Sequence, residues 1–389
     1  MDLLYILDHR FARTPGGEVW TDSLYEAAYW RRYLTVFDRV RVVARVRDVK
    51  AAETGWKRVD GEQVIVTALP YYVGPTGYLL QRRALRQVMK RVFERRAAVL
   101  LRIPSQLATC AASILRKRRI PFGVEVVGDP AESFSPGAVR HPLRAFFRWW
   151  YTHQQWRQCR NAVACQYVSL YLAKNYPCRT QIRYVCTDAE LSDDAFAMIS
   201  TNGGPHTPIR LLTVGSLEQM YKGTDVLIDA VAECVRTGLD LSLTVVGEGK
   251  YRLEFERLAK SRGLNGRASF TGRVAAGDAV RAYLDNADLF VLPSRTEGMP
   301  RALLEALARG LPCVASKVGG VPELLPEEDM VAPGDAAVLA RKLREVLTDP
   351  ERLTRMAERN IAEAGKYREA VLAPQRERFY RALKCVYST

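Results

Sequence analysis

The chain lacks any apolar run that approaches the roughly 20 residues of a membrane-spanning helix. Its first ten residues read as a short buried strand without a basic leader, so we expect no signal peptide. The eight cysteines are scattered without a C-x-x-C pair, which argues against structural zinc or disulfides and favours a reducing cytoplasm. Histidine is scarce, with four residues, and no Ser-His-Asp order or metal-ligand cluster is present. We therefore expect neither a bound metal nor triad chemistry.

Acidic residues are outnumbered in the first half of the chain. Residues 1–200 contain 31 Lys and Arg against 18 Asp and Glu, a net charge of +13. Residues 201–389 contain 27 against 25, a net charge of +2. The first half is therefore expected to face an anionic partner. A length of 389 residues, with 48% hydrophobic and 26% charged residues, is typical of a folded protein of two domains.

Both halves alternate between apolar strand-like runs and helical segments, which predicts α/β domains with doubly wound parallel sheets. A polar segment rich in Gly and Pro, 192–208, predicts a linker, so the expected domains are 1–200 and 201–366. Ligands of such sheets bind beyond the carboxyl ends of the strands, so two facing domains form a cleft. The predicted strands are 2–7, 39–45, 63–68, 98–103, 122–127 and 161–166 in the first half, and 209–214, 241–246, 268–270, 287–292 and 312–315 in the second.

The segment 287–320 carries the most specific pattern. A buried strand leads into a polar loop, where Gly298 frees the backbone and Pro300 suits the first turn of a helix that ends near Gly310. A strand-to-helix turn of this kind binds phosphate through free amides and the helix dipole. Glu297 and Glu305 flank it, and carboxylates beside a phosphate site are best explained by contacts to sugar hydroxyls. The pattern predicts a nucleotide-sugar pocket; an amphipathic helix with two surface glutamates is the simpler alternative.

The run Glu-Gly-Met-Pro-Arg-Ala-Leu-Leu-Glu-Ala from Glu297, followed by Gly310-Leu-Pro, resembles the signature of retaining GT-B glycosyltransferases of family 4. Among these it resembles bacterial exopolysaccharide, O-antigen and capsule enzymes. The resemblance implies two Rossmann-like domains facing a cleft, with a final helix at 367–389 that crosses back to the first domain. It implies a UDP- or GDP-hexose donor and no metal or cofactor. Glu305 would bind the ribose hydroxyls and Glu297 the hexose, close to its anomeric carbon.

A second donor-side element begins at the strand end 209–214. Gly215 permits close approach of a diphosphate and Lys222 neutralises it, although a solvated lysine at a helix start is an alternative. The resembled family has arginine where this chain has Ser216, and Arg301 is placed to replace part of that charge. The resemblance also assigns nucleotide contacts to Gly298, Met299, Pro300 and Gly247, with a plain strand-to-helix turn as the alternative at Gly247. It further assigns a contact to the segment with Arg273 and Val274, whose backbone would read the edge of the base.

In the first domain, Gly16 and Gly17 follow the first strand and resemble the family's glycine loop, with an ordinary turn as the alternative. Asp129 stands in a loop where many members carry a histidine. It is a candidate catalytic residue that would hold an acceptor or donor hydroxyl, and a turn aspartate is the alternative. His9, at the end of the first strand, either faces the cleft or caps local structure.

Two basic stretches, Leu79–Arg96 and residues 144–160, mix cations with aliphatic and aromatic residues. Such a mixture suits an interfacial helix on an anionic membrane, and core residues beneath a solvated basic face are the alternative. The cations are Arg82, Arg83, Arg86, Lys90, Arg91, Arg95 and Arg96 in the first stretch and Arg144, Arg148, Arg157 and Arg160 in the second.

The sequence therefore predicts a retaining transferase of hexose to a lipid-linked or glycan acceptor in cell-surface polysaccharide synthesis, peripheral to the inner face of the membrane. Alternatives on the same fold are a nucleotide-sugar epimerase and a glycosyltransferase with a small soluble acceptor. A phosphorylase would need a lysine motif for pyridoxal phosphate, which we do not find. A nucleic-acid-binding role is opposed by the glutamates at the pocket.

Overall fold

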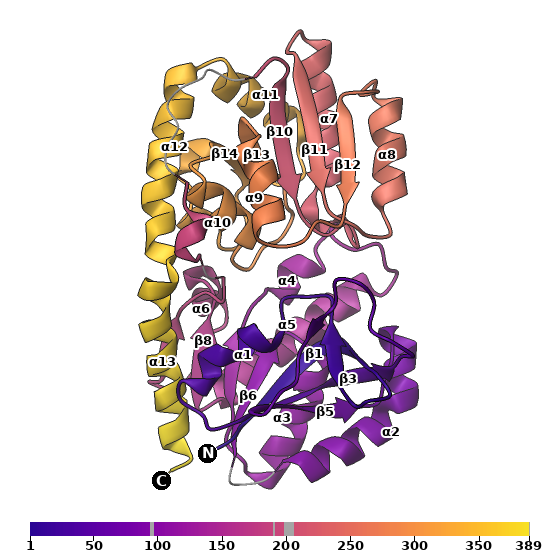
Figure 1. Cartoon of the computed structure of the whole chain (residues 1–389), viewed down its shortest axis with the longest axis vertical. Coiled ribbons are helices and arrows are strands. Elements are labelled where there is room, and N and C mark those ends of the chain that lie inside the picture. Colours follow the sequence, from indigo (N-terminus) through magenta and orange to yellow (C-terminus); the bar gives the residue numbers. More distant parts are fainter. Residues whose placement is uncertain (94–96, 190, 198–205, 389) are drawn as a thin grey trace.

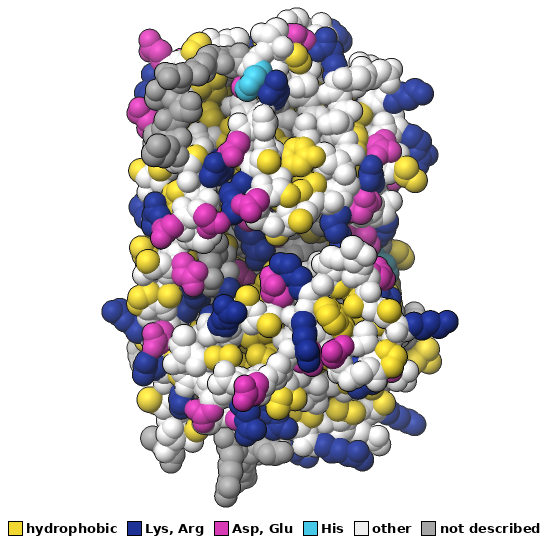
Figure 2. Space-filling model, viewed as in Figure 1, with side chains coloured by type: hydrophobic (Ala, Val, Ile, Leu, Met, Phe, Trp, Pro, Cys, Tyr) yellow, Lys and Arg dark blue, Asp and Glu magenta, His cyan; other side chains and the backbone are white. Residues whose placement is uncertain are grey.

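The structure is a computed structural model that describes residues 1–93, 97–189, 191–197 and 206–388. Two α/β domains are stacked along the long axis of the molecule, with the first domain at the end that holds both termini (Figure 1). Figure 2 shows that side chains of both signs of charge lie near the seam between the domains. No described helix combines the length and the apolar character needed to cross a bilayer.

The first domain contains a nine-stranded sheet. Seven strands run parallel in the order β5-β3-β1-β6-β7-β8-β9, while β2 pairs antiparallel with β1 and β4 with β2. Its strands are β1 (Leu3–Arg13), β2 (Val19–Thr21), β3 (Val40–Asp48), β4 (Lys57–Arg58), β5 (Val64–Leu69), β6 (Ala98–Ile103), β7 (Gly123–Val126), β8 (Ala164–Tyr167) and β9 (Arg183–Val185). Its helices are α1 (Ala27–Leu34), α2 (Gly74–Val92), α3 (Gln106–Arg118), α4 (Pro130–Ser133), α5 (Arg144–Asn161) and α6 (Leu170–Asn175).

The second domain contains a six-stranded parallel sheet in the order β12-β11-β10-β13-β14-β15. Its strands are β10 (Ile209–Val214), β11 (Leu241–Val246), β12 (Ala268–Gly272), β13 (Leu289–Leu292), β14 (Cys313–Ser316) and β15 (Met330–Val331). Its helices are α7 (Thr224–Arg236), α8 (Arg252–Ser261), α9 (Asp278–Asp285), α10 (Arg301–Ala308), α11 (Ala336–Leu347) and α12 (Pro350–Ala364). Each strand predicted from the sequence is present, and the fold is the predicted pair of doubly wound sheets.

The strands were predictable because the sheets are buried on both faces. In β1, Leu4 and Ile6 pack beneath α2 and α3, whereas Leu3 and Tyr5 pack on the opposite side with α1. Alternate residues of a strand point to opposite faces, so a strand covered on both sides reads as a continuous apolar run. The strands that the sequence did not reveal, β2, β4, β9 and β15, have only two or three residues each.

The C-terminal helix α13 (Glu369–Val386) runs along one side of the molecule and returns to the first domain (Figure 1). Phe379, Tyr380 and Leu383 join the core formed by β1 and α1, which confirms the predicted crossover. In the other direction, Ala189 and Leu191 already pack in the core of the second domain. The chain therefore crosses between the domains twice. Residues 198–205 of the predicted linker lie outside the described residues.

The first basic stretch differs from its predicted limits. The helix α2 begins at Gly74, five residues before Leu79, because Pro75 fits the first helical turn, where its missing amide costs no hydrogen bond. It ends at Val92, where Phe93 adopts an extended conformation. Arg95 and Arg96 lie outside the described residues.

Candidate active site

The predicted donor-side residues gather at one edge of the second sheet. Strands β10, β11, β12 and β13 are parallel neighbours, so the loops at their carboxyl ends meet. The Gly215 amide donates to the Val246 carbonyl at 2.9 Å, and the Gly247 amide donates to the Gly272 carbonyl at 3.0 Å. The Gly215, Gly247 and Arg273 loops, and the loop that precedes α10, thus form one continuous rim that faces the first domain.

Lys222 and Glu297 form the central ion pair of this rim. The Lys222 ammonium donates to Glu297 Oε1 at 2.6 Å, and the Ser294 hydroxyl donates to the same oxygen at 2.6 Å. The Lys222 methylene groups pass over Gly215 so closely that a Cβ there would lie 3.2 Å from them. Burial alone would lower the pKa of Lys222, but the Glu297 carboxylate raises it above its ordinary value. The fold thus brings Gly215, Lys222 and Glu297 together, and the Glu297 carboxylate keeps the lysine charged.

Gly298 has a role that the sequence did not reveal. A Cβ at this position would lie 2.3 Å from the Val127 carbonyl oxygen of the first domain. The neighbouring Met299 packs partly against the cores of both domains. The pocket loop therefore touches the first domain directly, and the glycine is needed for that close approach.

The helix α10 carries Arg301 and Glu305 one turn apart. Pro300 is the N-cap residue rather than part of the first turn, and the helix begins at Arg301. Gly310 follows the last turn with φ of 67°, which confirms it as the helix stop. Burial raises the pKa of Glu305, although the charges of Arg301 and Arg281 act against this shift. Glu305 is thus a partly buried carboxylate beside a cation at the helix start.

Arg301 also acts across the cleft. Burial alone would raise the pKa of Asp188 in the first domain, but Arg102, and after it Arg301, lower that pKa to about 2. The charge of Arg301 therefore acts on a carboxylate of the first domain as well as on Glu305 of its own helix.

Other predicted donor-side residues are engaged elsewhere. The Arg273 guanidinium donates to Asp22 Oδ2 at 2.5 Å, which links the second domain to the first. Ser216 accepts a hydrogen bond from the Glu218 amide at 3.2 Å and is exposed. Val274 packs against the core of the second domain. The sequence expectation that the segment at Arg273 reads a base through its backbone is compatible with this side-chain contact.

Gly16 and Gly17 form the turn between β1 and β2. The Gly17 amide donates to the Thr14 carbonyl at 2.9 Å, and Gly17 has φ of 88°, a left-handed conformation that favours glycine. The sequence allowed either a ligand-binding glycine loop or an ordinary turn at Gly16 and Gly17, and this geometry favours the ordinary turn. His9 is similar, because its Nε2 lies 3.1 Å from the Thr21 hydroxyl and 3.2 Å from the Ser23 hydroxyl. Burial lowers the pKa of His9 to about 4, so the ring is neutral at pH 7.

Asp129 is 2% exposed and caps α4. Its Oδ1 accepts from the Ala131 amide at 2.7 Å and from the Tyr176 hydroxyl, while its Oδ2 accepts from the Tyr171 hydroxyl at 3.0 Å. Both oxygens are thus occupied by the protein itself. The geometry favours the structural role of Asp129 over the catalytic one.

Several residues of the cleft carried no signal in the sequence. The Thr296 hydroxyl donates to Glu132 Oε2 of the first domain at 3.1 Å. The Glu323 carboxylate of the second domain accepts from the Leu170 and Tyr171 amides at the start of α6, both at 3.0 Å. These contacts join residues more than 150 positions apart, so no local sequence pattern could predict them. Ser294 could have been found, since it is a polar residue two positions after the buried strand β13 and three positions before Glu297.

The part of the chain that holds the rim matches a known family. A profile of the glycosyl transferases group 1 matches residues 197–363. The second domain is a group 1 glycosyltransferase domain. The described Lys222–Glu297 pair and the α10 residues all belong to this glycosyltransferase domain, whereas Asp22 and Glu132 contact it from outside.

The chain is also similar to individual known proteins. Protein CapJ of Staphylococcus aureus is 27% identical over 94% of this chain and 90% of its own. The amylovoran biosynthesis glycosyltransferase AmsK of Erwinia amylovora is 35% identical, but the match covers only 35% of each chain. Among solved structures, sucrose-phosphate synthase from Thermosynechococcus elongatus matches 99% of this chain and 100% of its own, with a TM-score of 0.72 and 17% identity. At that identity the likeness shows the fold alone, which is GT-B.

Proposed function

We propose that this group 1 glycosyltransferase belongs to the retaining family 4 and moves a hexose from UDP- or GDP-sugar to a lipid-linked or glycan acceptor. The observation that carries the proposal is the Lys222–Glu297 pair, 2.6 Å apart, on a strand-end rim of the second domain that contacts the first domain at Gly298. A cation that stays charged beside a carboxylate suits a diphosphate next to a sugar. The name of AmsK, an amylovoran biosynthesis glycosyltransferase, supports a role in polysaccharide synthesis, which we place at the cell surface.

Each residue of the rim has a role in this proposal. Lys222 and Arg301 neutralise the diphosphate, together with the amides at the start of α10. Glu297 accepts hydrogen bonds from the hexose, and Glu305 accepts them from the ribose. Lys222 has three N–H donors, and its described hydrogen bond to Glu297 uses one of them. The ammonium can therefore hold Glu297 and the diphosphate at the same time.

The proposed reaction is a substitution at the anomeric carbon of the hexose. The acceptor hydroxyl oxygen forms a bond to that carbon, the bond from the carbon to the diphosphate oxygen breaks, and the hydroxyl proton leaves with the diphosphate. The two cations stabilise the negative charge that develops on the diphosphate, which is the role a metal ion plays in other transferases. We therefore propose that the reaction needs no metal or cofactor, and that activity persists in excess chelator.

We also propose that the enzyme works in the cytoplasm on the inner face of the cell membrane. The net charge of +13 in residues 1–200 supports attraction to an anionic surface. Exposed Leu79 and Leu80 on α2, with exposed Phe146 and Trp149 on α5, add apolar groups to both basic stretches.

A ligand screen tests the donor assignment. Thermal unfolding is measured with UDP, GDP and ADP and with their hexose conjugates, because a ligand at 100 times its Kd stabilises by roughly 2.7 kcal/mol. We expect one base to give a clear shift that is reduced in Lys222→Met. Absence of a shift with every nucleotide would overturn the proposal. Retention is tested separately, because the anomeric configuration of the product by NMR must equal that of the donor.

A further inference from the structure

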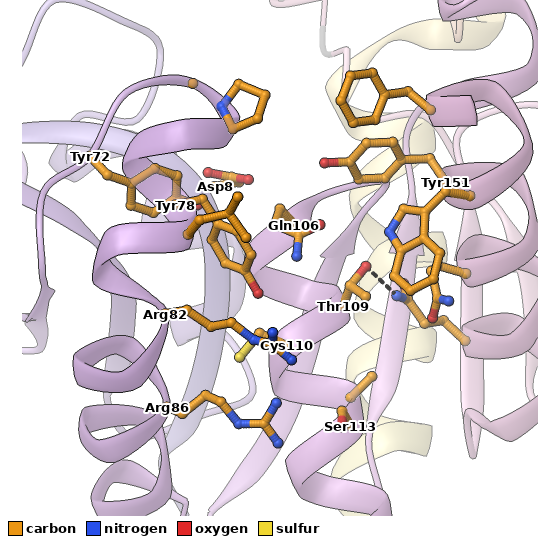
Figure 3. A pocket seen from close by; sticks show the side chains of 18 of the residues that line it. Asp8, Tyr72, Tyr78, Arg82, Arg86, Gln106, Thr109, Cys110, Ser113 and Tyr151 are labelled. Atoms are coloured by element: carbon orange, nitrogen blue, oxygen red, sulfur yellow. Dashed lines mark hydrogen bonds between the residues drawn. The ribbon is translucent and has the colours of Figure 1, made fainter. Parts of the chain in front are cut away.

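A cavity of about 780 Å³ lies inside the first domain between α2, α3 and α5. The helix α3 forms its floor through Gln106, Thr109 and Ser113, and α2 and α5 form its walls (Figure 3). The Gln158 amide of α5 donates to the Thr109 hydroxyl at 3.0 Å, which braces one wall against the floor. This volume suits a ligand larger than a monosaccharide.

The cavity is strongly basic. Five arginines and one carboxylate, Asp8, are among its described lining residues. Asp8 is already paired with Arg45 at 2.6 Å. The other four lining arginines make no ion pair with a carboxylate in the described part of the chain; they are Arg82 and Arg86 of α2, Arg116 of α3 and Arg157 of α5. Arg82 and Arg86 extend from their helix toward the floor (Figure 3). A site with this charge selects an anion.

The walls and lips of the same cavity are apolar. Phe147 and Trp150 of α5 line the interior. At the opening, Leu79 of α2 is 64% exposed, and Leu143, the N-cap of α5, and Phe146 in its first turn are 56% and 51% exposed. Exposed apolar side chains on both lips of one cavity mark a surface that meets an apolar partner. A soluble sugar phosphate would leave these side chains without a function.

The inner end of the cavity leads toward the donor rim. Asp8 and Arg45 also line a second cavity, of about 400 Å³, together with Trp20, Trp56 and Asp22. Asp22 is the residue that binds Arg273 of the glycosyltransferase domain. The basic cavity, the second cavity and the rim therefore follow one another. The aromatic residues of the second cavity provide apolar faces of the kind that sugar rings stack on.

Unused polar atoms also point to a ligand. In the described structure, the Tyr72 hydroxyl and the side-chain Oε1 of Gln158 are buried without a hydrogen-bond partner, and both residues line the basic cavity. Buried polar atoms are normally paired, so each is available to a ligand or to bound water.

We propose that the cavity between α2, α3 and α5 binds a lipid phosphate, an amphiphile with a phosphate or diphosphate head and an apolar chain. Arg82, Arg86, Arg116 and Arg157 hold the head, and the aromatic wall and the exposed lips take the chain. The proposal rests on the proposed function, because it makes this amphiphile the carrier of the acceptor sugar. The sugar passes Asp8 and Arg45 into the second cavity and reaches the donor rim from there.

The test measures binding of farnesyl phosphate to the full chain, with farnesol and inorganic phosphate as the chain-only and head-only probes. Intrinsic tryptophan fluorescence reports on Trp150 in the wall. We expect farnesyl phosphate to bind at least tenfold more tightly than either fragment. Equal binding of inorganic phosphate would show an anion site without a lipid role and would overturn the proposal.

Two variants that each remove two positive charges distinguish binding in the cavity from general attraction to the basic surface. Arg82→Ala/Arg86→Ala removes two lining cations and should weaken farnesyl phosphate binding at least tenfold. Arg83→Ala/Lys90→Ala removes two exposed cations of the same helix that do not line the cavity, and it should bind as wild type. Vesicles of phosphatidylcholine and phosphatidylglycerol should respond similarly to both variants, since they report on surface charge. Equal farnesyl phosphate affinity in the two variants would contradict the proposal.

A third variant works without a change of charge. Ser113→Trp places a large side chain on the cavity floor and should block the lipid phosphate while the nucleotide-induced thermal shift persists. If Ser113→Trp folds and binds farnesyl phosphate normally, the site lies elsewhere. Nucleotide binding is measured on every variant, so the two proposals fail independently: loss of all nucleotide response contradicts the donor assignment, and loss of lipid phosphate response contradicts the cavity.

Discussion

In the second domain, the buried charges at the strand ends form a simple pair, Lys222 with Glu297, and the lysine keeps N–H donors to spare. The first domain instead buries a network in which Arg102 contacts both Glu125 and Asp188. Glu125 also accepts hydrogen bonds from the Tyr5 and Tyr33 hydroxyls.

This difference separates charges that support the fold from charges that await a ligand. In the network, the Glu125 carboxylate is satisfied by groups of its own domain, and the Asp188 carboxylate is paired with Arg102 of that domain, with the charge of Arg301 as a weaker influence. In the rim, the ion pair satisfies the carboxylate and leaves part of the ammonium free. The first domain differs again at its own cavity, where four arginines lack carboxylate partners among the described residues. Unbalanced charge, rather than buried charge as such, marks the binding sites of this molecule.

The largest expected effect comes from breaking the simple pair. Lys222→Met removes the charge on the diphosphate and should lower turnover by about 10²–10³-fold, the magnitude for loss of one electrostatic stabiliser. It also leaves Glu297 buried without a cation, which should cost about 3–5 kcal/mol of stability. Turnover is measured by release of nucleoside diphosphate, and stability by urea unfolding.

Two further variants test the comparison with the network. Lys222→Met/Glu297→Gln removes both charges, so it should recover much of the stability and none of the activity. Arg102→Met should destabilise the protein by a similar amount but leave nucleotide affinity near that of wild type. If Arg102→Met weakened nucleotide binding as strongly as Lys222→Met, the division into structural and ligand-binding charges would be wrong.

The second effect concerns the contact between the domains. Gly298→Val places side-chain atoms where a Cβ alone would lie 2.3 Å from the Val127 carbonyl oxygen, so the domains must separate. A displacement of about 1 Å at the reacting groups costs on the order of 10²-fold in rate, and we expect a loss of that size. Nucleotide affinity should change little, because the diphosphate-binding cations belong to the second domain. Steady-state kinetics and nucleotide titration give the two quantities.

A matched glycine controls for the substitution itself. Gly365→Ala meets no atom within 4 Å of its Cβ and should behave as wild type. A Gly298→Val protein with normal turnover would show that catalysis does not need this contact.

The sequence predicted the second domain better than the first for a physical reason. Its site residues lie in loops that follow buried strands, so spacing along the chain reports their position in space. The first domain contributes through contacts such as Asp22 with Arg273 and Thr296 with Glu132, which depend on how the two domains pack against each other. Docking leaves no periodic pattern.

Asp129 shows a different limit of sequence reasoning. A loop aspartate after a strand is compatible with both a catalytic and a capping role. The two tyrosine hydroxyls that occupy it come from positions 171 and 176, more than 40 residues away. In the basic helices, likewise, the composition was clear from the sequence, but the cavity between α2 and α5 required the packing of both on α3.

A smaller effect is expected at Glu305. An ordinary glutamate has a pKa of about 4.3. Burial raises the pKa of Glu305 above its ordinary value despite the nearby arginines, so this carboxyl group takes up a proton at a higher pH. Ribose binding by the carboxylate should therefore weaken as the pH falls toward that raised value. The nucleoside is the better probe, because the terminal phosphate of a nucleotide titrates near pH 6. Glu305→Gln should bind about tenfold more weakly, consistent with one lost charged hydrogen bond, and show a flatter pH profile. An unchanged profile in Glu305→Gln would remove Glu305 from the ribose site.

The smallest expected effect tests whether the neutral ring of His9 belongs to the fold of the first domain. Burial lowers the pKa of His9 from 6.5 to about 4, so below pH 6.5 the unfolded chain binds a proton that the folded chain does not. Stability is therefore fully present above pH 6.5 and is lost as the pH falls toward 4. Between about pH 7 and pH 5.5 the free energy of unfolding should fall by about 1 kcal/mol for this reason, and ordinary carboxylates titrate below that window.

His9→Gln keeps a polar group near Thr21 and Ser23 but cannot be protonated, so its urea midpoint should fall less over that window. His153→Gln, which removes an exposed histidine, is the matched control. Equal pH slopes for wild type and His9→Gln would mean that His9 titrates in the folded protein as it does in the unfolded chain, and that the ring is open to the cleft after all.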